Sequence, residues 1–164
     1  MKIIIASGFG QGRTKLSAFD AALKGSGIQN YNLVYLSSII PVGTKIVKRS
    51  KYIARKSEYG HRLYIVRADI RSDRVGHYIS AGLGWYQNDD GSGVFVEHEE
   101  EGETKEGVRL NIEHQILDSL RDLRSFRGLP FHEGKVGMQI STGLVTGQAS
   151  CAITVAIYKS EGWD

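Results

Sequence analysis

The chain has 164 residues, of which 41% are hydrophobic and 24% charged, and its formal net charge is +3. That length predicts one domain over residues 1–164, with a core that needs no disulfide or metal for support. A single cysteine excludes an internal disulfide, and no apolar run exceeds five residues. We therefore expect neither a membrane span nor a secretory signal, and we predict a cytoplasmic protein.

The elements follow from hydrophobic spacing and from turn residues. Residues 3–6 predict a buried strand that the glycine-rich stretch 7–12 ends, and Thr14 predicts the start of a helix that closes at Gly25 and Gly27. Further strands are predicted at 31–36, 62–68, 77–86, 93–99, 135–144 and 149–158. A long helix is predicted at 105–125, with an apolar face of Leu110, Ile116, Leu117, Leu120 and Leu123. Strands that cluster without intervening helices favour an α+β fold.

Several motifs that would carry chemistry are incomplete. Residues 8–13 (GFGQGR) follow a strand and precede a helix, but they match neither the dinucleotide fingerprint nor the P-loop. The five histidines show no metal-ligand spacing, so we predict no metal site. Residues 45–56 carry six positive charges and no acid. A solvated loop or an edge hairpin is the favoured interpretation of this basic segment, since lysines often protect sheet edges, with a nucleic-acid patch as the alternative.

Residues 14–43 hold three unusual features. Asp20 is predicted at the edge of the apolar helix face, where a half-buried carboxylate requires a cation from the protein or from a ligand. If residues 31–38 are extended, Asn32 and Ser38 point to one face of the strand. Ser37 and Ser38 stand at the end of that strand, directly before Ile39, Ile40 and Pro41.

This region resembles the pyruvoyl-dependent arginine decarboxylases. The matching motifs are AFDAAL at 18–23, GIQNYNL at 27–33 and LSSIIP at 36–41. A second block, GVFVEHE at 93–99, is similar to the family's apolar strand that ends in glutamate, an aromatic residue and glutamate. The resemblance covers almost the whole chain. It implies a layered αββα sandwich of antiparallel sheets flanked by helices.

The resemblance implies that the chain makes its own electrophile. The Ser38 hydroxyl would attack the Ser37 carbonyl to give an ester, and β-elimination followed by hydrolysis would leave a covalent pyruvoyl group at position 38. The products would be a β chain, 1–37, and an α chain, 38–164. Asn32 would assist processing by stabilising the oxyanion. No metal and no pyridoxal phosphate would be required.

The same resemblance assigns the decarboxylation site. The pyruvoyl ketone would form a Schiff base with L-arginine, and Glu97 would donate the proton that follows loss of CO2, yielding agmatine. Asp20 would hold the substrate guanidinium as a bidentate partner. The other substrate-binding positions implied are Leu16, Leu23 and Tyr31, and the bulk of Tyr31 would narrow the substrate channel.

The expected assembly is a homotrimer or a dimer of trimers with active sites between subunits, without nucleic-acid or membrane partners. Two alternatives remain open. The basic segment 45–56 replaces an apolar, proline-rich stretch of the family, so the same chemistry on a different amino acid is one of them. The other is a trimeric scaffold that is never processed and has no catalytic activity.

Overall fold

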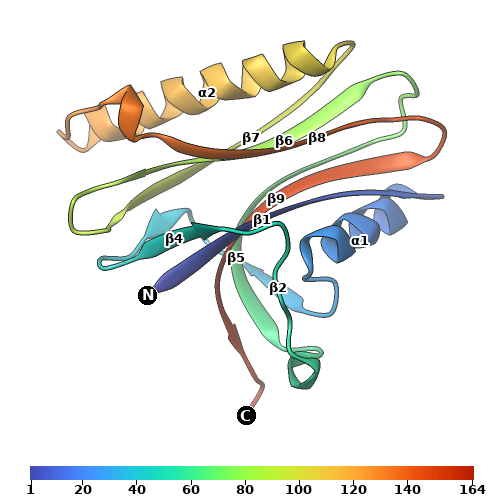
Figure 1. The fold of residues 1–164 in the computed structure, drawn as a ribbon, viewed down its shortest axis with the longest axis horizontal. Coiled ribbons are helices and arrows are strands. Elements are labelled where there is room, and N and C mark those ends of the chain that lie inside the picture. The colour runs from blue at the N-terminus through green and yellow to red at the C-terminus, as the bar shows by residue number, and fades with distance from the viewer.

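The computed structural model describes residues 1–164 as a sandwich of two sheets with one helix on each outer face (Figure 1). Helix α2 (Lys105–Phe126) covers the sheet of β6, β7 and β8, and α1 (Lys15–Ser26) lies against the sheet that contains β1, β5 and β9. This arrangement confirms the predicted α+β fold of the layered αββα type. Neither helix is both long enough and apolar enough to cross a bilayer.

The two sheets differ in size and in strand direction. The larger sheet has the order β2 (Asn32–Tyr35), β5 (Arg62–Ser72), β9 (Ala149–Glu161), β1 (Lys2–Gly12), β4 (Lys45–Lys48). The smaller sheet has the order β3 (Ile39–Ile40), β7 (Gly93–Gly102), β6 (Tyr78–Gln87), β8 (Gly137–Leu144). All pairs are antiparallel except the edge pairs β1–β4 and β2–β5. The start of the basic segment is thus an edge strand that bears lysines, but β4 pairs in parallel with β1, so the predicted edge hairpin was wrong.

Strand β1 runs through the glycine-rich stretch, so the prediction that residues 7–12 end the strand was wrong. The glycines face α1, and a Cβ at Gly8 or Gly10 would collide with backbone atoms of Ala21 and Ala22. Alternate glycines therefore let the helix approach the strand closely enough to bury Ala18 and Ala22 completely. The stretch is a packing surface rather than a turn or a phosphate-binding loop.

We expect Gly10→Ala to destabilise the fold by about 1–3 kcal/mol, because the added methyl group forces α1 away from β1. Urea denaturation followed by circular dichroism measures the change. Gly147→Ala is the matched control, since a Cβ there meets no atom within 4 Å. Equal stability of the two variants would contradict the packing role of the glycines.

Both helices start at threonine caps. The Thr14 hydroxyl accepts from the Ser17 N–H, and the Ser17 hydroxyl accepts from the Thr14 N–H, both at 3.0 Å, so the predicted cap is confirmed. The apolar face predicted for the long helix was partly wrong, because Leu110 is 51% exposed. The buried positions of α2 recur every fourth residue and are Val108, Ile112, Ile116, Leu120 and Arg124.

The chain changes sheets between β2 and β3. Strand β2 ends at Tyr35 on the edge of the larger sheet, and β3 begins at Ile39 on the edge of the smaller one. Between the sheets lies an apolar core that includes Ile5, Leu83 and Phe95. Ser37 and Ser38 therefore sit in the crossover at one edge of the sandwich, beside this core.

Candidate active site

Ser38 has an unusual backbone conformation. Its φ angle is +53°, and it is the only residue other than glycine with a positive φ. The left-handed region costs a residue with a Cβ about 1–2 kcal/mol, so the surrounding structure must hold it. The strain is located at the residue for which the sequence predicts self-cleavage.

Two hydrogen bonds fix the backbone that follows the strained residue. The Phe95 N–H donates to the Ser38 carbonyl at 2.8 Å, as part of the pairing between β3 and β7. The Tyr158 hydroxyl, from β9 of the opposite sheet, donates to the Ile39 carbonyl at 2.9 Å. Both sheets thus hold the backbone on the C-terminal side of Ser38. Ser37, on the other side of the Ser37–Ser38 peptide bond, is exposed.

Glu97 lies next to the Ser38 side chain. The Ser38 Oγ donates a short hydrogen bond to Glu97 Oε1, and Glu97 is partly buried on β7. Burial, and next the negative charge of Glu97, raise the pKa of Tyr158 above its usual range. Tyr158 therefore remains a neutral donor at neutral pH. The structure brings Ser38 and Glu97 together, although 59 residues separate them in sequence.

Tyr158 is a site residue that the sequence analysis missed. We expect Tyr158→Phe to slow the cleavage predicted at Ser38 about five- to tenfold, because the lost hydrogen bond contributes about 1 kcal/mol to holding the peptide. The measurement is the rate at which the full-length band disappears on a denaturing gel. Tyr64→Phe removes a comparable hydrogen bond to Glu161 far from Ser38. Equal slowing in both variants would contradict a local role for Tyr158.

A cleft of about 470 Å³ opens beside Ser38 and Glu97. Its far wall comes from α2 and includes Ser119, Asp122 and Phe126. His98, which points from β7 toward α2, forms a hydrogen bond of 2.9 Å between its Nε2 and Ser119 Oγ. Burial lowers the pKa of His98, so it is neutral at pH 7. No pattern in the sequence pointed to this wall.

The residues implied as substrate ligands lie on another part of the surface. Asp20 and Leu16 are exposed on α1, and Leu23 is buried beneath them. The expectation of a half-buried Asp20 was wrong, because the residue is exposed. No cation of the chain pairs with its carboxylate, so of the two expected sources of a cation only a ligand remains. The exposed side of α1 simply extends further around the helix than the apolar spacing suggested.

Asn32 and Tyr31 do not reach the Ser38 cleft of the same chain. The Asn32 side-chain amide donates to the Gly60 carbonyl at 2.6 Å, and the Tyr31 hydroxyl donates to Glu58 at 2.5 Å. The expectation that Asn32 and Ser38 point to one face of a single strand was wrong, because Ser38 lies outside β2. Strand β2 ends at Tyr35, and the left-handed turn at Ser38 breaks the alternation.

The structure contains no group of three or more histidine, cysteine or acidic residues arranged to hold a metal ion. The prosthetic group implied by the resemblance would be made from a serine, so the question is whether Ser38 suits that chemistry. Its hydroxyl is directed to a carboxylate and its backbone is held in a strained turn, and both features suit it.

Comparison of the sequence with known proteins shows which family the chain resembles. The sequence model of the pyruvoyl-dependent arginine decarboxylases matches residues 2–162. A pyruvoyl-dependent arginine decarboxylase of Methanothermobacter thermautotrophicus is 33% identical over 158 residues, which cover 96% of each chain. One of Halobacterium salinarum is 31% identical over 160 residues, covering 96% of this chain and 93% of the relative.

The matched family and relatives are decarboxylases, which are carbon–carbon lyases. The chain belongs to the pyruvoyl-dependent arginine decarboxylase family. This result confirms the resemblance seen in the sequence, and it implies a covalent pyruvoyl group as the cofactor.

Proposed function

We propose that the chain cleaves itself between Ser37 and Ser38 and then converts L-arginine to agmatine and CO2. The observation that carries this proposal is the hydrogen bond from the Ser38 hydroxyl to Glu97 at a left-handed serine. It supports the proposal because a nucleophile, a proton acceptor and a strained backbone meet at one bond.

The self-cleavage consumes one water molecule and releases one ammonia. Glu97 takes the proton as Ser38 Oγ attacks the Ser37 carbonyl and returns it to the Ser38 nitrogen as the C–N bond breaks, so the Ser37–Ser38 amide becomes an ester with a free amine. Loss of the Ser38 Cα proton to a base then breaks the Cβ–Oγ bond, which frees the carboxylate of Ser37 and leaves a dehydroalanine at 38. Hydrolysis of its amine gives the pyruvoyl group on chain 38–164. The hydrogen bonds of Phe95 and Tyr158 would keep the new terminus in place.

In decarboxylation, position 38 would hold the pyruvoyl group, which would supply an electron-accepting carbonyl for the substrate α-amine as CO2 leaves. Glu97, within hydrogen-bond reach of position 38, would return a proton to the α-carbon. The cleft beside Ser38 and Glu97 has room for the substrate side chain. Its α2 wall would shield the reacting atoms from water.

The guanidinium site would come from a neighbouring subunit. Asp20, Leu16 and Asn32 are accessible on a surface that does not line the cleft of their own chain. A trimer, or a pair of trimers, would place this surface over the next subunit's Ser38. Leu23 and Tyr31 would support it from beneath, since both are buried.

We expect Asp20→Asn to raise the KM for arginine about ten- to a hundredfold while cleavage at Ser38 proceeds normally. The loss corresponds to about 1.5–3 kcal/mol for a hydrogen-bonded charge pair. Steady-state release of labelled CO2 measures it. Asp73→Asn, a change at an acid that pairs with Lys15, is the matched control. An unchanged KM in Asp20→Asn would remove Asp20 from the substrate site.

The substrate is tested by offering the purified, cleaved protein a panel of amino acids. Arginine is expected to give agmatine and CO2 in equal amounts, with lysine and ornithine much slower because neither presents a planar fork to a carboxylate. Preference for another amino acid would retain the pyruvoyl chemistry but overturn the arginine assignment. A chain that never cleaves would favour the scaffold alternative.

A further inference from the structure

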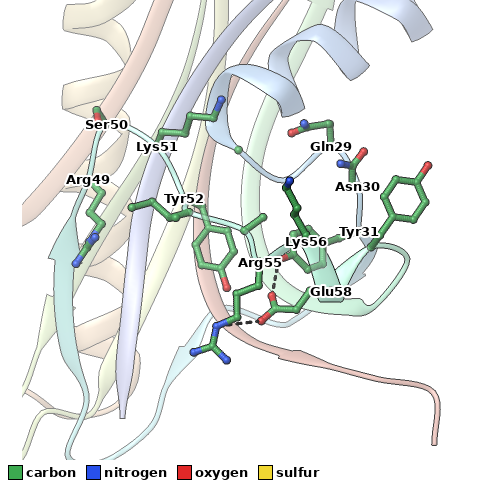
Figure 2. Close-up of a pocket in the computed structure, with 14 residues that line it drawn as sticks. Gln29, Asn30, Tyr31, Arg49, Ser50, Lys51, Tyr52, Arg55, Lys56 and Glu58 are labelled. Atoms are coloured by element: carbon green, nitrogen blue, oxygen red, sulfur yellow. Dashed lines mark hydrogen bonds and ion pairs between the residues drawn. The ribbon is translucent and has the colours of Figure 1, made fainter.

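The largest pocket of the molecule, about 760 Å³, shares no lining residue with the Ser38 cleft. It lies between the end of α1 and the basic segment, as Figure 2 shows. We call it the basic pocket and define it by its lining residues 27, 29–31, 49–56, 58 and 59.

The walls of this pocket are held by specific contacts. The Tyr52 N–H donates to the Ser26 carbonyl at 2.9 Å, which fixes the basic segment across the end of α1. A Cβ at Gly27, whose φ is +87°, would collide with the Tyr52 carbonyl. The rings of Tyr31 and Tyr52 pack edge to face with centroids 6.1 Å apart. The pocket is therefore part of the folded structure rather than a chance gap beside a loop.

The charge of the pocket is not balanced within the chain. Arg49, Lys51 and Lys56 form no ion pair, and Arg55 lies 3.8 Å from Glu58. Glu58 is the only acid in the lining, and it also accepts the hydrogen bond from Tyr31. The lining thus contains four cations and one carboxylate, and that carboxylate already binds Tyr31 and Arg55.

The end of α1 does not neutralise these cations. Its last carbonyls accept hydrogen bonds from the N–H groups of Gly27, Ile28 and Tyr52. Figure 2 shows Lys51 and Lys56 on the side of the pocket nearest α1, while Arg55 turns toward Glu58. The two lysines are free to contact a ligand.

We propose that the basic pocket binds a nucleotide-sized phosphorylated small molecule. Clustered phosphate charges match the two lysines and two arginines among the lining residues. Ile53 and Tyr59 are 75% and 76% exposed and offer apolar surface for a flat ring. The volume is within the range of small-molecule sites, which favours a metabolite over a nucleic-acid strand. The pocket is distinct from the Ser38 cleft, and Tyr31, which supports the proposed guanidinium site, forms part of its wall.

The test is calorimetric titration of the full-length protein with ATP, without added metal, at near-physiological salt. We expect saturable binding of one ATP per chain. The double variant K51E/K56E reverses two charges that have no partner in the chain, and it should weaken binding at least tenfold. The matched control K105E reverses an exposed lysine at the start of α2, and its affinity should stay within twofold. Circular dichroism confirms that both variants are folded.

Further binding measurements test whether the ligand is a nucleotide-sized molecule. Tyr59→Ala should weaken ATP binding several-fold and leave the binding of inorganic tripolyphosphate unchanged. Absence of saturable ATP binding, or equal weakening by K51E/K56E and K105E, would overturn the proposal. It would also be overturned if a single-stranded RNA oligonucleotide bound far more tightly than ATP, with an affinity that grew with its length.

Discussion

Ser38→Ala is expected to leave an intact chain of 18.1 kDa without decarboxylase activity. The alanine lacks the Oγ that attacks the Ser37 carbonyl, and no other hydroxyl donates to Glu97. Folding should be retained, because alanine bears about the same cost as serine at a φ of +53°. A denaturing gel and an assay for CO2 release measure the two effects.

Ser37→Ala is the matched control for this change. Only the carbonyl of residue 37 takes part in the proposed cleavage, and the Ser37 side chain is exposed. We expect cleavage of this variant at close to the normal rate. Cleavage of Ser38→Ala, or failure of both variants alike, would contradict the assignment of Ser38 as nucleophile.

Glu97→Gln is expected to lower the rate of decarboxylation per pyruvoyl group by about a hundredfold to ten-thousandfold, as for loss of a general acid. Cleavage at Ser38 should also slow, since an amide cannot accept the hydroxyl proton. For that reason activity is divided by the pyruvoyl content, which is titrated with a carbonyl reagent after long incubation.

Glu100→Gln provides the comparison on the same strand. Glu100 points to the α2 side and accepts a hydrogen bond of 3.1 Å from Gln115, so its removal should change neither step. If Glu97→Gln retained full activity per pyruvoyl group, another residue would have to supply the proton. The Ser38–Glu97 contact would then serve cleavage or the fold and not decarboxylation.

The sequence was sufficient to predict most of the elements and the layered fold. Alternation and turn residues placed the long strands β5, β6, β7 and β9 within a few residues of their observed bounds. The course of β1 was not predictable in this way, because glycine normally weakens strands. Its place in the strand depends on the close approach of α1, which is a tertiary contact.

The candidate site was predicted unevenly for a similar reason. Ser38 and Glu97 were identified from short motifs, and the structure joins them across the crossover and β7. Tyr158 and the α2 wall carried no motif, since their roles depend on how the two sheets and α2 pack. The burial of Asp20 was overestimated because helical spacing shows which face is apolar but not how much of it is covered.

The basic segment also gains a physical explanation. Its first residues form the edge strand β4, and the remainder crosses the end of α1 and lines a pocket with unpaired cations. A sequence run of charges shows neither a concave wall nor the lack of acidic partners. The segment lies away from the Ser38 cleft of its own chain, so it does not place positive charge beside that serine.

Intact mass spectrometry of the purified protein under denaturing conditions tests the central claim most directly. The account predicts fragments of roughly 4 and 14 kDa, from 37 and 127 of the 164 residues. The larger fragment should be lighter by one ammonia than a chain with serine at its start, and it should react with a carbonyl reagent. A single unmodified chain of 18.1 kDa that persists after warming and ageing would contradict self-processing at Ser38.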